Sequence, residues 1–187
     1  VNDAPSLRFA DVGVAMGITG TDVSKGASDM ILTDNNFTTI VHAIEEGRNI
    51  YNNIKKTIIF LLSCNLGEII CIFLSTLLNW DLPLIATQLL WVNLVTDTLP
   101  ALALGIDPGD KDVMKRSPRN PKESFFSEGA GMRAVIGGTL IGLLTLAAFY
   151  IGISETGMIG NLGQLEAMAK AGNEAAKHAL TQGRTMA

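Results

Sequence analysis

Residues 57–78 read TIIFLLSCNLGEIICIFLSTLL and contain one charged side chain, that of Glu68. As an α-helix this stretch is long enough to cross a hydrocarbon core, which takes about 20 residues. A charged side chain at the middle of a membrane span costs roughly 2.5–3.5 kcal/mol on insertion scales, so its presence needs a reason. We therefore predict a membrane helix here and treat Glu68 as a candidate binding residue.

Two further apolar stretches have the same character. Residues 84–106 contain one charged side chain, Asp97, and residues 131–153 contain one, Arg133. The chain of 187 residues is 48% hydrophobic, which a soluble domain with three core helices could also reach. Such helices, however, usually carry a polar face. The sequence predicts an α-helical transmembrane bundle with three spans and the start of a fourth at residues 183–187.

The lysines and arginines near the predicted spans indicate their orientation, because cytoplasmic loops are rich in both. They gather before the first span and between the second and third, at Arg48, Lys55, Lys56, Lys111, Lys115, Arg116, Arg119 and Lys122. The connection NWDLP at 79–83 has none. We expect residues 1–56 and 107–130 in the cytosol and a loop at 154–182 outside. With no signal peptide and no initial Met, we expect the chain to be a piece of a longer one.

Residues 1–36 have the pattern of a cytosolic α/β domain fragment. Short strands are predicted at 11–17 and 30–34, with a short helix at 21–29 between them. From Phe37 onward apolar side chains recur at three- and four-residue steps, which indicates a helix.

No proline interrupts residues 37–78. We predict a cytosolic stalk at 37–56 that continues directly into the span at 57–78. Such a helix could carry movement from one compartment to the other.

Polar side chains of the first two spans fall on facing surfaces. Asn65 precedes Glu68 by three positions, and Asn93, Thr96 and Asp97 follow the i, i+3, i+4 spacing, so each set shares a helix face. The short turn makes the two spans antiparallel neighbours. At a rise of 1.5 Å per residue, Glu68 lies about 16 Å from the turn, between Asn93 at about 15 Å and Asp97 at about 21 Å.

This set of side chains has the chemistry of a metal site. Carboxylate, amide and hydroxyl oxygens are the ligands that Ca²⁺ takes, in sets of six to eight. Pro100 has no N–H for the Thr96 carbonyl, which could then line a cavity or bind an ion. The alternative is that the amides and the hydroxyl bond between helices while both carboxyls are protonated. Five such residues together favour the ion site. Cys64 and Cys71 fit reduced packing residues better than a soft-metal site.

Four motifs resemble those of the P-type ATPases, and within them the sarcoplasmic-reticulum-like (type IIA) Ca²⁺-transporting pumps. VNDAP at 1–5 resembles the end of the TGDGVNDAP hinge motif of the phosphorylation domain. NLGE at 65–68 is similar to the fifth-helix motif, WVNLVTD with LPALALG at 91–105 to the sixth, and SPRNPKE at 117–123 to the following loop. These matches run in order across essentially the entire chain. Thr98 departs from the pattern, since many members have Gly there.

The resemblance implies a fold. Residues 1–36 would be the C-terminal part of a haloacid-dehalogenase-like phosphorylation domain. The spans at 57–78, 84–106 and 131–153 would be the fifth, sixth and seventh helices, and the eighth would begin at 183.

The resemblance also implies roles for particular residues. Asn65, Glu68, Thr96 and Asp97 would form one Ca²⁺ site, and Asn93 with Asp97 a second. In the cytosolic fragment, Asn2 and Asp3 would lie at the edge of the Mg²⁺–phosphate site. Asp29 would correspond to an acidic residue of a regulatory monovalent-cation site.

From these observations and the resemblance we expect part of an ATP-driven enzyme that moves Ca²⁺ out of the cytosol by way of an aspartyl phosphate formed outside this chain. Proton counter-transport through Glu68 and Asp97 is expected in return. The expected partners are membrane lipid, the remaining helices of the same pump and ATP bound by other domains, with no nucleic acid. We expect the plasma membrane of a prokaryote. A pump for Mn²⁺ or another cation, a passive cation channel or carrier subunit, and a noncatalytic ion-binding membrane fragment stay open as alternatives.

Overall fold

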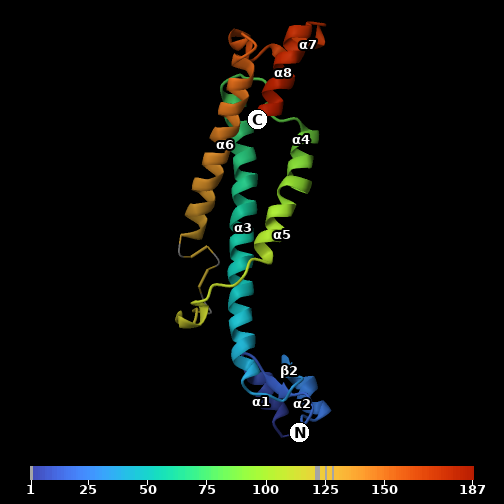
Figure 1. Ribbon diagram of the computed structural model, residues 1–187, viewed down its shortest axis with the longest axis vertical. Helices are drawn as coiled ribbons and strands as arrows, with labels where there is room; N and C mark the ends of the chain where they lie inside the picture. Colours follow the sequence, from blue (N-terminus) through green and yellow to red (C-terminus); the bar gives the residue numbers. More distant parts are fainter. Residues whose placement is uncertain (1, 121–122, 125, 128) are drawn as a thin grey trace. The chain divides into compact units, whose positions relative to one another are not determined.

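The computed structural model describes the whole chain except residues 1, 121–122, 125 and 128. Val1 of VNDAP and Pro121 and Lys122 of SPRNPKE are therefore outside the described residues. The chain forms two compact units, which comprise residues 1–51 with 108–117 and residues 52–107 with 118–187. We describe each unit by itself (Figure 1).

The first unit begins with a small α/β segment. Its elements are α1 (Ala4–Phe9), β1 (Val14–Met16), α2 (Asp22–Ala27) and β2 (Met30–Leu32). The strands pair in parallel with Ala15 opposite Ile31, and α2 forms the crossover between them. The Thr21 hydroxyl caps α2 by accepting a hydrogen bond from the Ser24 amide at 3.3 Å. Both strands are shorter than the sequence predicted.

Asparagine and aspartate side chains define the chain between β2 and the next helix. Asn35 has a φ of 54°, a left-handed conformation that Asn tolerates better than most residues. The Asp34 carboxylate accepts hydrogen bonds from the Thr39 hydroxyl at 2.6 Å and from the Asn36 amide at 3.0 Å. These bonds, the one from Thr39 above all, lower the pKa of Asp34. They fix the start of α3 (Thr39–Leu77).

The loop at 108–117 completes the first unit. It contains a 3₁₀ turn, Val113–Lys115, whose Val113 side chain is buried. The Arg48 guanidinium, on α3, donates to the carbonyls of Val113 at 3.0 Å and Arg116 at 2.9 Å. Arg48 thus holds this loop in place. The sequence had pointed to Arg48 only as one of the charges that indicate the cytosolic side of the first span.

The second unit is helical. Besides the C-terminal part of α3, it contains α4 (Ala86–Trp91), a π-helical turn (Val92–Thr96), α5 (Thr98–Gly105), α6 (Ala130–Ser154), a 3₁₀ turn (Ile159–Asn161), α7 (Leu165–Lys170) and α8 (Glu174–Met186). Figure 1 shows α6 along one side of α3 and the α4–α5 segment along another.

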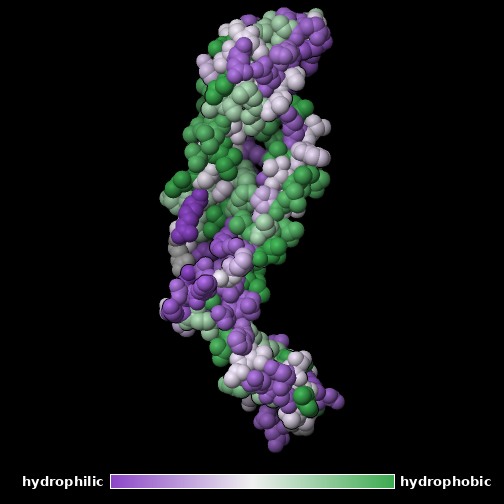
Figure 2. All heavy atoms as spheres, viewed as in Figure 1, coloured by the Kyte–Doolittle hydropathy of each residue, from purple (hydrophilic) through white to green (hydrophobic). Residues whose placement is uncertain are grey.

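Within the described residues, α3 and α6 are the helices long and apolar enough to cross a membrane. Figure 2 shows apolar atoms over the middle of the second unit and polar atoms over α7 and α8. The stretch at 84–106 is not one regular helix as predicted, because the π turn divides it into α4 and α5. A count of three spans therefore stays a prediction.

The C-terminal region also differs in detail from the prediction. The sequence predicted a loop with a helix in it at 154–182 and a new helix from 183, but one helix, α8, crosses this boundary from Glu174 to Met186. The Asn173 side chain caps its start by accepting from the Ala176 amide at 3.2 Å. Gly183 lies in the middle of the contact with α6, where an added Cβ would stand 2.9 Å from Ile153.

The turn at 79–83 has a defined geometry. Asn79 has a φ of 54°, the Asn79 amide bonds the Thr76 carbonyl at 3.1 Å, and the Trp80 amide bonds the Ser75 carbonyl at 2.9 Å. This is the Schellman arrangement that ends a helix. Trp80 stacks on Tyr150 of α6 and packs against a buried apolar cluster. That cluster consists of Phe149, Ile153, Leu162, Leu165, Ala176, Ala179 and Leu180.

Helices α3 and α6 approach each other through glycines. On α3 the buried residues recur every fourth position, at Ser63, Gly67, Cys71 and Ser75. A Cβ added to Gly67 would stand 2.7 Å from the Ile141 side chain, and one added to Gly138 would stand 2.8 Å from Leu66. Small residues of this kind let helix backbones pack closely in membranes. The contact fixes α3 beside α6 along the part of α3 that carries Glu68.

We predict that Gly67→Ala destabilises the full-length protein, since over-packing a close contact typically costs about 1–3 kcal/mol. The matched control is Gly47→Ala on the same helix, where a Cβ would meet no atom within 4 Å. Ala is the better helix former by about 1 kcal/mol, so this variant should be neutral or stabilised. Thermal unfolding in detergent measures both. Equal melting temperatures for the two variants would contradict the close contact.

Candidate ion-binding site

Three residues of the candidate site, Asn93, Thr96 and Asp97, lie in the π turn or directly after it. The Asp97 amide donates to the Val92 carbonyl at 2.9 Å, five residues back instead of four. The Thr98 hydroxyl donates to the Asn93 carbonyl at 3.3 Å. The sequence predicted a disturbed helix at Pro100, whereas the irregular turn lies before it, at Val92–Thr96, and Pro100 itself lies in α5. Single π turns within helices are often found at functional sites.

Glu68 and Asn93 come together across α3 and the π turn. The Asn93 Nδ2 donates to Glu68 Oε1 at 2.9 Å and to Oε2 at 3.0 Å, and also to the Leu89 carbonyl at 2.9 Å. Glu68 is half-buried, and its carboxylate is held by an amide that is itself anchored in α4. The structure therefore joins two of the five residues that the sequence grouped.

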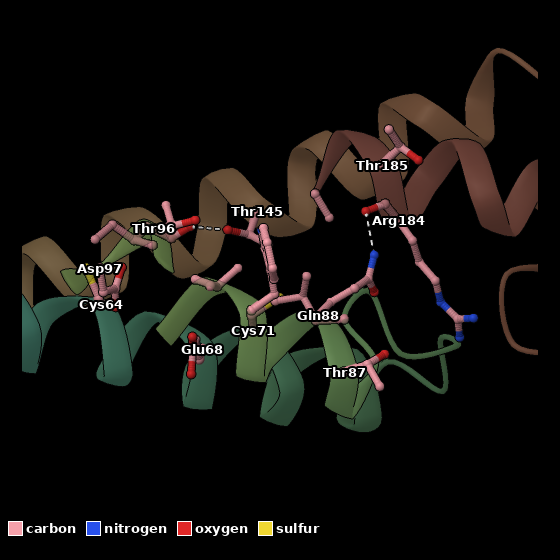
Figure 3. A pocket seen from close by; sticks show the side chains of 15 residues that line it. Cys64, Glu68, Cys71, Thr87, Gln88, Thr96, Asp97, Thr145, Arg184 and Thr185 are labelled. Atoms are coloured by element: carbon pink, nitrogen blue, oxygen red, sulfur yellow. Dashed lines mark hydrogen bonds between the residues drawn. The ribbon is translucent and has the colours of Figure 1, made fainter. Parts of the chain in front are cut away.

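Asp97 is the most buried of the five, with 4% of its surface exposed. Among the residues that the structure describes, its Oδ2 has no hydrogen-bond partner. Figure 3 shows its carboxylate beside Cys64 of α3. An unsatisfied polar atom in an apolar interior costs free energy, so a buried carboxylate of this kind calls for a ligand.

Both carboxylates face one cavity. Glu68, Thr96 and Asp97 are among the residues that line a hollow of about 860 Å³ between α3, α4, α6 and α8. Asn65 is exposed and donates to the Leu61 carbonyl of its own helix at 2.8 Å. It is not among the lining residues.

The acidic part of this site is small. Over the described ranges of the chain, no three His, Cys, Asp or Glu side chains gather closely enough to hold a metal ion. Any cation here would meet two carboxylates, with neutral oxygens supplying the rest. Amide and hydroxyl oxygens of the predicted residues are such donors.

Five polar lining residues were not singled out from the sequence: Thr87, Gln88, Thr145, Arg184 and Thr185. Thr145 lies in the third apolar stretch, and its hydroxyl bonds the Ile141 carbonyl of its own helix at 2.9 Å. Thr87 and Gln88 stand at the polar start of the second stretch. The sequence offered one signal for these residues, which is a polar side chain within a predicted apolar stretch. Only the folded helices show which of these side chains face a common cavity.

The predicted cytosolic residues belong to the first unit. Asn2 and Asp3 are exposed, and the Asp3 side chain makes no capping bond to α1. The Asp29 Oδ2 accepts from the Gly13 amide at 2.8 Å. Asp29 thus supports the loop before β1.

Comparisons with known proteins identify the class to which this helical unit and its polar cavity belong. The family model described as "Cation transporting ATPase, C-terminus" matches residues 81–187. The chain therefore belongs to the cation-transporting ATPases, as part of their C-terminal region.

The relatives narrow this class. The chain is 66% identical to "Calcium-transporting ATPase 1" of Bacillus cereus over 152 residues, which is 81% of this chain and 17% of that protein. It is 57% identical to "Calcium-transporting ATPase" of Bacillus subtilis over 151 residues, which is 81% of this chain and 17% of that protein. It is 48% identical to "Calcium-transporting ATPase 2, endoplasmic reticulum-type" of Arabidopsis thaliana over 160 residues, which is 86% of this chain and 15% of that protein. The chain is homologous to calcium-transporting ATPases and spans about a sixth of their length.

The unpartnered Oδ2 of Asp97 suggests a test of whether this carboxyl group binds Ca²⁺. We expect Asp97→Asn in the full-length protein to raise the melting temperature in the presence of a chelator, because an amide costs less to bury than a carboxyl group whose Oδ2 has no partner. The same change should abolish stabilisation by added Ca²⁺, which would be about 2.7 kcal/mol at a hundred times the dissociation constant.

Asp107→Asn is the matched control, since Asp107 is an exposed partner of Lys56 at 2.8 Å. It should respond to Ca²⁺ as the unmodified protein does. Undiminished Ca²⁺ stabilisation of Asp97→Asn would show that Asp97 does not bind the ion.

Proposed function

We propose that this chain is the part of an ATP-driven pump that binds Ca²⁺ within the membrane and carries it out of the cytosol. The observation that carries the proposal is the buried Asp97, whose Oδ2 lacks a protein partner in the described structure. It opens onto the cavity that Glu68 also lines. A second acidic group at the same cavity supplies the charge that a divalent cation requires.

The proposed ligands are the oxygens of Asn65, Glu68, Asn93, Thr96 and Asp97. Asn93 already contacts Glu68, and rotation of its amide by half a turn would present Oδ1 in place of Nδ2. Ca²⁺ takes six to eight oxygen ligands, so further oxygens would come from water or other helices of the pump. Asn65 would need to turn toward the cavity.

The long helix α3 is the proposed route of coupling. It is continuous from Thr39 to Leu77 and carries Glu68. In the proposed cycle an aspartyl phosphate forms on a residue outside this chain, with Mg²⁺ near Asn2 and Asp3. Movement of the phosphorylation domain would then act on Glu68 through α3. The proposed location is the plasma membrane of a prokaryote.

The first test is phosphorylation of the full-length protein by ATP. We expect an acid-stable phosphoenzyme that forms only when Ca²⁺ is present and is lost in Glu68→Gln. Glu174→Gln is the matched control, because Glu174 is exposed and pairs with Lys177 at 2.6 Å. Phosphorylation that depends on Mn²⁺ and not on Ca²⁺ would favour the alternative cation pump. No phosphoenzyme with either ion would leave a noncatalytic ion-binding protein.

The second test concerns protons. Two carboxyl groups line the same cavity, so when a divalent cation leaves, protons are the cations that could take its place there. We expect Ca²⁺ uptake into proton-tight vesicles to make the lumen more alkaline, and the effect to be reduced in Asp97→Asn per Ca²⁺ moved. Uptake with no change of internal pH would exclude proton counter-transport.

A further inference from the structure

We propose that Arg184 is a positioning residue that holds closed the end of the cavity nearest the turn at 79–83. We call this the turn end, lined by Thr87, Gln88, Arg184 and Thr185. The inference rests on the proposed function, because it assigns Arg184 a part in releasing the transported ion. Figure 3 shows Arg184 and Gln88 at the side of the cavity opposite to Thr96, Asp97 and Cys64.

Arg184 joins three segments of the second unit. Its Nε donates to the Leu82 carbonyl in the turn at 3.1 Å, and its Nη2 donates to Glu166 Oε2 of α7 at 3.4 Å. Its side chain is 17% exposed although it is always charged. A cation placed so far from water is costly unless its bonds are kept, so these contacts favour one arrangement of α8, α7 and the turn.

Gln88 extends the connection to α4. Its Nε2 donates to the Arg184 carbonyl at 3.3 Å, while its Oε1 accepts from the Ile85 amide at 3.0 Å. The start of α4 is therefore tied to α8 at the residue that also holds the turn. Because α4 leads directly into the π turn, a change at Gln88 has a short covalent path to Asn93 and Asp97.

The turn at 79–83 also has bonds that do not involve Arg184. The Asp81 amide donates to the Leu162 carbonyl at 2.8 Å, and Asp81 Oδ2 accepts from the Glu166 amide at 3.1 Å. Lys170 pairs with the same Glu166 at 3.0 Å, and hydrogen bonding by Lys170, more than the charge of Arg184, lowers the pKa of that carboxyl. Arg184 is thus not needed to neutralise Glu166. The distinctive contact of its side chain is the bond to the Leu82 carbonyl, and the main-chain carbonyl of the same residue accepts from Gln88.

The consequence concerns how the ion leaves. While these bonds hold, α8 and the start of α4 stay together and close the turn end. An outward path from Glu68 and Asp97 opens when α8 separates from Gln88 and Leu82. The fixed positive charge of Arg184 would also repel a cation that returns along that path.

The test uses Arg184→Gln in the full-length protein, with Lys170→Gln as the matched control. Cys71 is fully buried and lines the cavity, so its thiol reports access from the turn end. A membrane-impermeant methanethiosulfonate is applied to sealed vesicles of each orientation, and modification of the Cys71 peptide is followed by mass spectrometry. We expect modification at least tenfold faster in Arg184→Gln from the side of the turn, with Lys170→Gln like the unmodified protein.

Gln88→Leu removes a different bond, the one from Gln88 Nε2 to the main-chain carbonyl of Arg184, which Arg184→Gln leaves in place. It should also speed the modification, so it decides the matter if Arg184→Gln does not accumulate. Arg184→Lys keeps the charge and can make one of the bonds, so its rate of Cys71 modification should lie between those of the unmodified protein and Arg184→Gln. Unchanged Cys71 rates in both Arg184→Gln and Gln88→Leu would overturn the proposal.

Transport gives an independent readout. We expect Arg184→Gln to keep Ca²⁺-dependent ATP hydrolysis in permeabilised membranes but to move fewer ions per ATP in sealed vesicles, by at least twofold. An unchanged ratio would count against Arg184. If the unmodified protein moves no Ca²⁺ at all, the proposed function fails, whereas the thiol measurement still judges the closure of the turn end.

Discussion

The burial of Asp97 is the constraint on which the rest of the second unit depends. A carboxylate with one oxygen left without a hydrogen bond is expensive in an apolar environment, and its cost must be met by the packing around it. The close glycine contact of α3 with α6 and the apolar cluster around Phe149 and Leu165 supply that packing. These regions can be well ordered while the π turn beside Asp97 keeps an irregular backbone.

The residues of the site on α3 and those at the π turn differ in how regular their backbone is. Glu68 lies on a regular helix that is held against α6, and Asn93 bonds both of its oxygens. Asp97 follows the π turn, and the Thr98 hydroxyl donates to the Asn93 carbonyl within it. Single π turns of this kind are often found at functional sites. Ion binding and helix rearrangement would therefore meet at the same five residues.

Much of this arrangement follows from local rules, and these were readable in the sequence. The apolar stretches, the long helix α3 and the approach of Glu68 to Asn93 all depend on helical period and rise. The π turn could be placed only roughly, because Pro100 marks a disturbance but not the residues that absorb it. The outward position of Asn65 and the contacts of Arg184 depend on which helices pack together. No spacing along the chain encodes that packing.

Asn93 links binding and movement most directly. Its amide can donate to Glu68 through Nδ2 or, after rotation, offer Oδ1 beside it, so one residue serves the carboxylate with or without a cation. Its backbone carbonyl accepts from the Thr98 hydroxyl, and α4, which leads into its π turn, carries Gln88, whose side chain is tied to Arg184. Because Asn93 stands between these two attachments, a shift at either of them would change the distance between Asn93 and Glu68. The proposed ion ligand Asn93 and the contact of Gln88 with Arg184 are thus parts of one short segment.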